Sequence, residues 1–388
     1  MSPVRLCFFC SLSSFDTGMP ISTFKLIEHF SRHPDYAVHV ILPAEGELSR
    51  RVRKCGIEPW IIPFHRFRSW RRMGDFFRFL VSFPVSLLRI CLVLRKNRIR
   101  LIHFSDIIDL PFFACGHFSR AAAVAHLRHC IESAPARFFF VVISKLFIDK
   151  TICISEAALR FSGLGRSRCH VVYNPGPDPL LFHPGQAFPP VPGLPEKGKI
   201  VLTIGKFLLV KGHEHFVALA RRIEAAHPGL CRFVILGNKF PAHERYFTEV
   251  RSLIEKSGLS RSIAILDQVS HETVPAILSH CSVYVHLPNW QEGLGGAILE
   301  AMAMQVPVVA FNCGGIGECF TSGVSGFLVD RLDIDAAAGH VVKLLQNEGF
   351  RAQMGIAARK ELMAKFSYQK HFSEIERIYF SLLSNPDT

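Results

Sequence analysis

Short apolar runs recur along the first half of the chain, separated by turn-forming and amphipathic segments. The runs at 4–10, 37–42, 100–104, 121–127 and 151–154 predict strands, and the segment 21–30 predicts a helix. The first strand, the helix and the second strand follow one another directly. That order predicts a βαβ opening, which is typical of a doubly wound sheet.

The same alternation returns after the proline-rich segment 184–199, which is typical of a linker between domains. Apolar runs there predict strands at 200–204, 232–236, 262–266, 282–287, 307–311 and 326–329. Predicted helices lie between them, and the chain ends in helices from 336 to about 383. We therefore predict an α/β protein with doubly wound domains at 1–190 and 191–365, followed by a C-terminal helix at 366–388.

One predicted helix, at about 295–304, is apolar on nearly all sides yet carries the carboxylate Glu300. A buried carboxylate without partners is costly, so Glu300 must face a cleft, a cation or a hydrogen-bonding ligand. Glu292 precedes this helix, followed by the run Gly293-Leu294-Gly295-Gly296. Glycines leave backbone N–H groups open at the positive end of the helix dipole, which suits a phosphate. An anion site between two carboxylates fits a sugar nucleotide.

Two lysines lie in the segment GKFLLVKG at 205–212, directly after the first strand of the second half. Lys206 and Lys211 on a glycine-flanked loop after a strand predict a clamp for a diphosphate. The alternative is a solvated loop that binds nothing.

Basic side chains lie at or just past predicted strand ends in the first half: His103, His126, Arg128 and His129. Open α/β sheets bind ligands at the carboxyl ends of their strands, so these residues are candidates for a cleft. A lone histidine is more often structural, and that alternative stays open for His129 and His126. Gly18 precedes the first helix without a GxGxxG pattern, so a dinucleotide site is disfavoured and a plain turn glycine stays possible.

The chain has 388 residues and a formal net charge of +13, which suits two domains and implies an acidic partner. Residues 60–100 interleave basic and aromatic side chains, with Arg66, Arg68, Arg71 and Arg72 among them. This pattern predicts an interfacial patch for an anionic membrane surface. A pair of core-facing helices with solvated arginines is the alternative. A nucleic-acid partner is not expected, since no binding module is recognisable.

Targeting and metal signals are weak. The 12 cysteines form no framework or zinc spacing, which favours a reducing compartment. The apolar run at 6–10 is too short for a signal peptide, and the run at 79–88 is too short to span a bilayer. We expect a cytoplasmic protein, with a peripheral position on the cytoplasmic face of the inner membrane as a refinement.

Asp333 and Asp335 precede an alanine-rich helix, where they predict a helix cap and not a metal site.

Several motifs together resemble a known family. EGLGGAILEAMAMQVPVVAFNCGGIGE at 292–318 is similar to the EGFGLxxLEAMAxGxPVVAxxxGGxxE run of family 4 retaining glycosyltransferases, which have the GT-B fold. Glu292 and Glu300 match the Glu-x7-Glu pair of that family, and GKFLLVKG resembles its GRLxxxKG. The departures are Leu294 for Phe, Gly296 for Leu and Gln305 for Gly, which leave the required charges in place.

The resemblance implies two Rossmann-like domains facing across a cleft, with the last helix crossing back onto the first domain. It implies a nucleotide-sugar donor, retention of anomeric configuration, no cofactor and no essential metal. Gly314, Gly315 and Glu318 would line or shape the nucleotide pocket. By this resemblance the catalytic residues would be Glu292, His129, Lys206 and Lys211. The donor would bind Gly18, Lys206, Lys211, Glu292, Gly293, Leu294, Gly295, Gly296 and Glu300, with the last of these on the ribose.

The predicted function is therefore transfer of a sugar to a saccharide or lipid-linked saccharide acceptor. Cell-envelope polysaccharide or lipopolysaccharide biosynthesis is the expected setting, because the basic and aromatic patch suits an amphiphilic or anionic acceptor. Two alternatives remain at this stage: a sugar-nucleotide epimerase of the same fold, and a protein that binds a sugar nucleotide without turnover.

Overall fold

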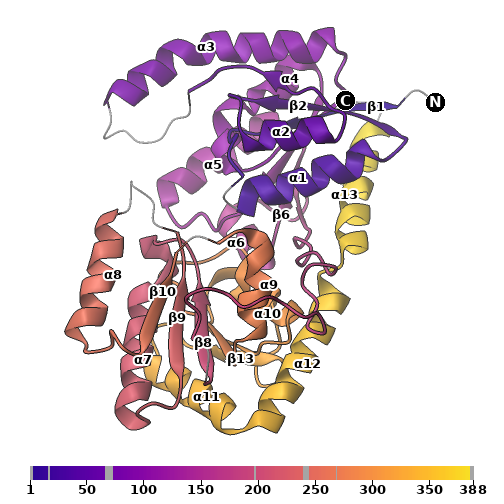
Figure 1. Cartoon of the computed structure of the whole chain (residues 1–388). Helices are drawn as coiled ribbons and strands as arrows, with labels where there is room; N and C mark the ends of the chain where they lie inside the picture. The colour runs from indigo at the N-terminus through magenta and orange to yellow at the C-terminus, as the bar shows by residue number, and fades with distance from the viewer. Residues whose placement is uncertain are drawn as a thin grey trace. The chain divides into compact units, whose positions relative to one another are not determined.

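The computed structural model describes residues 3–15, 18–65, 73–195, 198–238, 244–267 and 269–384 of the chain. The chain forms two compact units (Figure 1): unit 1 comprises Met1–Asn174 with Gln369–Thr388, and unit 2 comprises Pro175–Tyr368. Residues 175–190, which the sequence analysis assigned to the first domain, fall in unit 2. There the Gly176 N–H donates to the Phe366 carbonyl at 2.8 Å.

Unit 1 is built on a seven-stranded sheet in the order β3-β2-β1-β4-β5-β6-β7. Every strand pair in it is parallel. The strands are β1 (Val4–Phe9), β2 (Tyr36–Leu42), β3 (Trp60–Ile61), β4 (Leu101–Phe104), β5 (Ala122–Leu127), β6 (Lys150–Cys153) and β7 (Cys169–Val171). The order of connection reverses between β1 and β4, so helices cover both faces of the sheet.

Successive residues of β1 point to opposite faces of this sheet. The Phe9 ring packs 5.2 Å from Phe112 on one face, and the Phe8 ring packs 6.2 Å from Phe30 on the other. Helices α3, α4 and α5 supply core residues such as Ile90 to the Phe9 face. The helical elements are α1 (Gly18–Ser31), α2 (Glu47–Lys54), α3 (Met73–Lys96), η1 (Ile107–Phe112), α4 (Ala114–Ser119), α5 (Ala134–Phe147) and α6 (Glu156–Ser162).

The last helix, α13 (Tyr368–Leu383), packs within unit 1 on the Phe8 face. The Tyr379 hydroxyl lies 2.5 Å from Nδ1 of His103 on β4. The Phe372 ring stacks on His29 of α1 with centroids 3.9 Å apart. These contacts join the end of the chain to the first half of its sequence.

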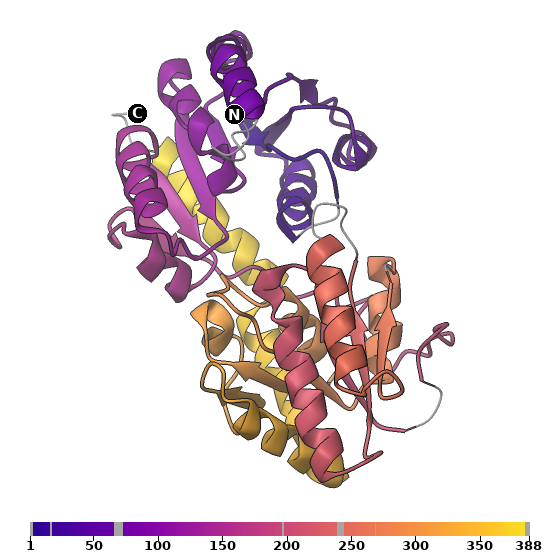
Figure 2. The same ribbon diagram turned by 90° about the vertical axis from the view of Figure 1, so that its left-hand side faces the viewer.

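Unit 2 repeats the topology with a six-stranded sheet in the order β10-β9-β8-β11-β12-β13, again wholly parallel. Figure 2 shows helices on both faces of the sheet. The strands are β8 (Ile200–Ile204), β9 (Arg232–Leu236), β10 (Ile263–Leu266), β11 (Val283–His286), β12 (Val308–Phe311) and β13 (Gly326–Val329). The four central strands, β9, β8, β11 and β12, are mostly apolar and buried, as parallel strands covered on both faces require.

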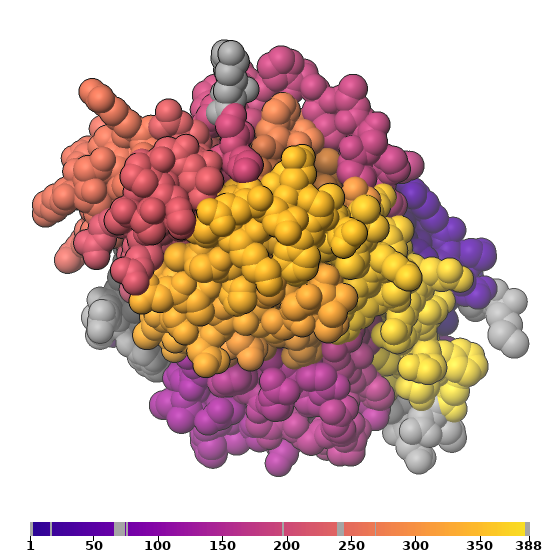
Figure 3. Space-filling view, turned by 90° about the horizontal axis from the view of Figure 1, so that it is seen from below, coloured from indigo at the N-terminus to yellow at the C-terminus, as the bar shows by residue number. Residues whose placement is uncertain are grey.

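The helices α7 to α10 of unit 2 lie in the connections between its strands, whereas α11 and α12 follow the last strand and form one continuous surface of the unit (Figure 3). Asp333 caps α11 through Oδ1, which accepts the Ala336 N–H at 2.9 Å, so the capping prediction for this aspartate is confirmed. Asp335 pairs with Arg222 at 2.7 Å. The helical elements are η2 (Leu209–Lys211), α7 (His213–Ala226), α8 (Glu244–Lys256), η4 (His271–Thr273), α9 (Val274–Ser279), α10 (Gly296–Ala303), η5 (Gly314–Glu318), α11 (Ile334–Gln346) and α12 (Glu348–Lys365).

Candidate functional site

The predicted donor residues of unit 2 gather at the carboxyl ends of β8 and β11. These two strands are neighbours in the sheet, and the order of connection reverses between them. The loop after β8 carries Lys206 and Lys211, and the loop after β11 carries Glu292. Such a reversal point is where open α/β sheets leave a crevice for a ligand.

Glu292 forms the centre of this group. Its Oε1 accepts from Lys211 Nζ at 2.6 Å, and its Oε2 lies 3.2 Å from His286 Nε2. The side chain is only 14% exposed, so the contact is shielded from water. Burial acts to raise the pKa of the Glu292 carboxyl, but Lys211 and His286 outweigh it and hold that pKa well below its usual range. Glu292 is therefore a carboxylate at neutral pH.

His286 is a residue of this group that the sequence analysis did not identify. It ends β11, is buried, and places Nδ1 3.0 Å from the hydroxyl of the buried Tyr284. Tyr284 and His286 are two apart in a strand, so they point to the same face of the sheet. The signal was available, because a histidine at the carboxyl end of a parallel strand is the same feature that identified the histidines of unit 1.

Glycines hold the Glu292 loop close to a neighbouring turn. Gly314 has φ +61°, and a Cβ there would lie 2.1 Å from the Glu292 carbonyl oxygen. The next residue, Gly315, donates its N–H to the same carbonyl at 2.8 Å. Only glycine fits this approach, so the GG pair fixes the backbone that carries the carboxylate.

The loop that carries Lys211 is also hydrogen-bonded directly to the loop that carries Glu292. Asn289 donates through Nδ2 to the Leu209 carbonyl at 2.7 Å, and its own N–H donates to the Val210 carbonyl at 3.0 Å. Gly212 has φ +63°, and a Cβ there would lie 2.0 Å from the Leu287 carbonyl oxygen. The loop of Lys211 is thereby set in register with the loop of Glu292.

Glu300 lies on α10 and has a hydrogen-bonding partner. Its Oε1 is 3.0 Å from Nε2 of His271, and its side chain is half-buried. The His271 ring in turn lies 5.4 Å from the Phe182 ring. The requirement that this carboxylate face a cation or a hydrogen-bonding group is met by an imidazole from η4.

The glycine run before α10 has mixed exposure. Gly293 and Gly295 are buried, Leu294 is half-buried, and Gly296 is exposed at the start of α10. The backbone of Gly295 is hydrogen-bonded to the Cys319 thiol, which partly offsets the rise that burial causes in the pKa of Cys319. Part of this run therefore packs inward.

The remaining predicted donor residues are Lys206 and Gly18. Lys206 is half-buried on the loop after β8, and its carbonyl accepts the Leu208 N–H at 2.6 Å. Gly18 begins α1 in unit 1, and a Cβ there would meet nothing within 4 Å. The residues just before it, Asp16 and Thr17, lie outside the described part of the chain.

The histidines at the strand ends of unit 1 differ in how exposed they are. His129 is 63% exposed, and its Nε2 lies 3.1 Å from Oδ2 of the buried Asp106. Burial tends to raise the pKa of Asp106, but His129 and Arg128 lower it below its usual value. Sequence reasoning did not identify Asp106 as a partner of His129. His126 is 1% exposed, so His129 is the accessible one of the two.

His103 and His126 instead belong to a buried network around Arg128. His103 Nε2 lies 3.3 Å from His126 Nδ1, and Arg128 lies 3.4 Å from that same nitrogen. Arg128 also donates to the Ser105 carbonyl at 2.9 Å. Burial, aided by Arg128, lowers the pKa of His103 to about 3. Both histidines are therefore neutral and structural.

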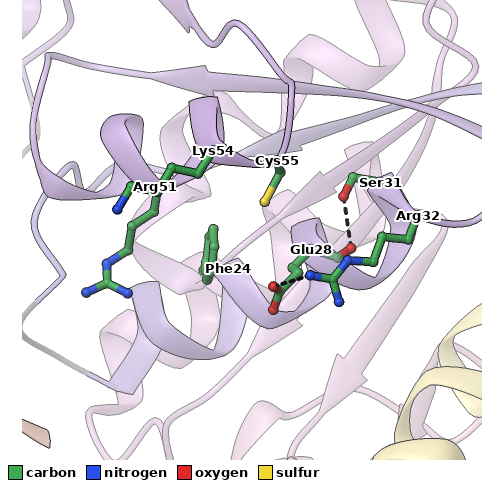
Figure 4. A pocket seen from close by; sticks show the side chains of 7 residues that line it. All are labelled: Phe24, Glu28, Ser31, Arg32, Arg51, Lys54 and Cys55. Carbon is green, nitrogen blue, oxygen red and sulfur yellow. Dashed lines mark hydrogen bonds and ion pairs between the residues drawn. The ribbon is translucent and has the colours of Figure 1, made fainter. Parts of the chain in front are cut away.

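A further pocket in unit 1, of about 410 Å³, lies between α1 and α2 (Figure 4). Its charges are largely paired, since Arg32 bonds Glu28 at 2.8 Å and Arg51 bonds Glu47 at 3.0 Å. Helices of βαβ units run antiparallel to their strands, so these helix ends lie at the sheet edge opposite the strand carboxyl ends. The pocket is lined by Phe24, Glu28, Ser31, Arg32, Arg51, Lys54 and Cys55.

Among the described residues, no group of three or more His, Cys, Asp or Glu side chains is arranged to hold a metal ion. Lys211, Glu292 and His286 instead offer two basic groups and one carboxylate at one strand edge. This set suits an anionic ligand that also carries hydroxyl groups.

Comparisons with known proteins find similarity mainly in the second unit. Residues 186–361 match the family model described as Glycosyl transferases group 1. The chain is 29% identical over 168 residues to the 2-deoxystreptamine N-acetyl-D-glucosaminyltransferase of Niallia circulans, which is 43% of this chain and 41% of that protein. It is 32% identical over 120 residues to the capsular polysaccharide biosynthesis glycosyltransferase CapM of Staphylococcus aureus, 31% of each chain. The chain thus spans less than half the length of these relatives.

A solved structure covers the chain almost completely. The crystal structure of Anabaena Alr3699/HepE in complex with UDP and glucose matches with a TM-score of 0.81, at 17% identity, over 97% of this chain and all of that one. At that identity the likeness shows a shared fold.

Proposed function

We propose that the protein is a glycosyltransferase that moves a sugar from a nucleotide-sugar donor to an acceptor, since residues 186–361 match the model of glycosyl transferases group 1 and the chain shares its fold with a solved GT-B structure. The predicted α/β, GT-B fold is thereby confirmed. The observation that carries the proposal is the group Lys211–Glu292–His286 at the reversal point of the unit 2 sheet.

In the proposed complex the donor diphosphate lies on Lys211 and Lys206. An ammonium group has three donors, and Glu292 occupies one from Lys211, which leaves that lysine capable of binding phosphate oxygens. Two cations beside the leaving nucleotide stabilise the negative charge that develops as the sugar–oxygen bond breaks. Glu292, ionised and buried, accepts from donor-sugar hydroxyls and stabilises positive charge at the anomeric carbon. Glu300 binds the ribose hydroxyls, with His271 holding its other side.

We propose retention of anomeric configuration without a metal. The bond between the anomeric carbon and the diphosphate oxygen breaks, and the acceptor hydroxyl attacks the same face. The departing phosphate oxygen takes the acceptor proton, so no protein nucleophile is needed. His129, supported by Asp106, is the proposed contribution of unit 1 to binding the donor sugar.

For the acceptor we propose a saccharide of a cell-envelope polysaccharide, with lipid-linked saccharides and lipopolysaccharide core included. Support comes from the match to a capsular polysaccharide glycosyltransferase. HepE was solved with UDP and glucose, which supports UDP-sugars as the first donors to test.

The test is incubation with a panel of nucleotide sugars, following free nucleotide and the identity of the sugar. A transferase releases nucleotide, slowly with water and faster with an acceptor. An epimerase changes the sugar and releases nothing, and a binding protein shifts its melting temperature without turnover. Lys211→Ala should abolish release. A matched control, Lys343→Ala on α11, removes a lysine that lies 4.9 Å from the Phe350 ring and should leave release unchanged.

A further inference from the structure

Helix α3 has two apolar faces, of which only one is covered. Ile90 and Leu94 point inward and have no exposed surface. Six apolar residues on the opposite side are more than half exposed, with Val81 reaching 76%: Phe77, Leu80, Val81, Val85, Leu88 and Leu92. Intervals of four, four, three and four residues, from Phe77 to Leu92, place five of them on a single helical face, and Leu80 lies at its edge. An uncovered stripe of large apolar side chains calls for an occupant.

Helix α5 presents a second stripe of the same kind. Phe138 is 64% exposed, and Phe139, Val142 and Leu146 are exposed on the same helical face. Helix α4 packs against both α3 and α5, and it adds the exposed Phe118, whose ring lies 6.4 Å from Phe147 of α5. We define these residues of α3, α4 and α5 as the apolar face of unit 1.

Basic side chains border this face. Arg78, Arg89 and Lys96 are exposed on α3, and intervals of 11 and 7 residues align them along one edge of the stripe. Lys145 is exposed on α5, next in sequence to Leu146. The chain as a whole carries a formal net charge of +13. Apolar side chains edged by arginine and lysine are complementary to a bilayer surface with anionic headgroups.

From this geometry we propose that the apolar face of unit 1 docks on an anionic phospholipid bilayer, with α3 and α5 lying in the interface. The proposal is independent of the transfer reaction. It also does not depend on Arg66, Arg68, Arg71 and Arg72, which lie outside the described residues.

Two other occupants fit less well. Phe77–Lys96 is long and apolar enough to cross a membrane, but the inner side of α3 forms part of the unit 1 core, so spanning would dismantle that core. A second copy of the chain would bring two arginine- and lysine-edged faces together in a protein that is already strongly positive. Like charges at an interface oppose such pairing.

The test is flotation of the whole protein with vesicles of phosphatidylcholine alone or with phosphatidylglycerol added. We expect binding to the anionic vesicles and little binding to the neutral ones. Val81→Asp/Leu88→Asp and, separately, Phe138→Asp/Leu146→Asp should each lower partitioning at least roughly tenfold, because two apolar anchors are replaced by charges that the lipid repels. Arg78→Gln/Arg89→Gln/Lys96→Gln should lower it and weaken its salt dependence.

The matched control is Leu180→Asp/Phe380→Asp, which removes two apolar side chains that are 85% and 71% exposed elsewhere on the chain. It should bind like the unaltered protein. All substituted positions are exposed, and melting temperatures verify folding. Equal binding by the α3 and α5 variants would overturn the proposal. So would a dimer in sedimentation equilibrium that those variants convert to monomers, because the face would then join two copies.

Discussion

The charge of Glu292 is maintained by its neighbours and not by water. Lys211 lies 2.6 Å from one carboxylate oxygen and His286 3.2 Å from the other, in a site where the glutamate is 14% exposed. Burial alone would favour the protonated acid, which could neither bind a lysine as an ion pair nor stabilise positive charge on a sugar. The two basic groups are therefore what makes this carboxylate usable.

The depressed pKa of Glu292 can be measured directly. In a carboxyl-labelled protein, with the Glu292→Gln variant for assignment, we expect the Glu292 signal to stay in its ionised position well below pH 4. Lys211→Ala should shift its titration upward, because the nearest cation is lost while burial remains. Titration of Glu292 near pH 4.3 in the unaltered protein, the usual value for glutamate, would contradict the assignment.

The same shift has a consequence for stability. A carboxyl whose pKa is lower in the folded state contributes stability above its unfolded pKa, and that contribution is lost as the pH falls towards the folded value. In the Glu292→Gln variant, the free energy of unfolding should therefore decrease less steeply with falling pH in this acid range than in the unaltered protein. Glu348→Gln, on an exposed side chain at the start of α12, is the matched control and should not.

At the scale of elements, the site depends on turns that bring two loops together. Gly314 belongs to η5 in the connection from β12 to β13, whereas Glu292 lies in the connection from β11 to β12, yet the Gly314 Cα faces the Glu292 carbonyl. The sequence run that includes both residues can thus be understood as one packing unit: strand β11, the Glu292 loop, α10, β12 and the glycine turn.

Gly314→Ala tests this dependence. The new Cβ would lie 2.1 Å from a backbone oxygen, and the residue would keep a φ of +61°, so the Glu292 loop must move. We expect a loss of about 1–3 kcal/mol in the free energy of unfolding. If Glu292 shifts by about 1 Å, kcat/KM should fall on the order of 100-fold.

Gly339→Ala on α11 is the control for that variant, since a Cβ there meets nothing within 4 Å. It should keep its activity and gain stability slightly, because alanine is favoured over glycine inside a helix. Equal activity in the two variants would show that the glycine turn does not position the Glu292 loop.

The sequence allowed much of this element-level picture to be predicted. The strands of unit 2 follow from apolar runs, and the predicted strands at 200–204 and 232–236 have the observed bounds of β8 and β9. The proximity of Lys211 to Glu292 follows from the rule that strand carboxyl ends share one edge. The pairings of Glu300 with His271 and of His129 with Asp106 could not be predicted, because each depends on loop conformations that no periodicity encodes. The uncovered face of α5 was also missed, since an apolar helix looks the same in sequence whether or not a partner covers it.

At the scale of the whole chain, the two units differ in how many neutral histidines they bury. His103 and His371 in unit 1 have pKa values lowered to about 3, mainly by burial, and burial also lowers the pKa of His126 strongly. Unit 2 buries His213, whose pKa burial lowers to about 4. The three histidines of unit 1 meet the last helix and the central strands: His371 lies on α13 itself, and His103 contacts Tyr379 of that helix.

These lowered pKa values predict an acid-sensitive unit 1. Below about pH 6.5 the histidines of the unfolded chain bind protons, whereas the buried histidines of the folded chain stay neutral. Folding stability therefore falls as the pH falls. Each such histidine contributes about 1.4 kcal/mol per pH unit between its unfolded and folded pKa values. Three of them in unit 1 against one in unit 2 imply that unit 1 loses its stability first.

Hydrogen exchange at pH 7, 6 and 5, corrected for intrinsic rates, provides the measurement. Protection of β4, β5 and α13 should fall more steeply with acid than protection of β8 and β11. His371→Phe should reduce that steepness, because it removes one titrating group while keeping a ring on α13. Parallel loss of protection in both units would instead mean that acid acts through groups common to the whole chain, since three of the four buried histidines with lowered pKa values lie in unit 1.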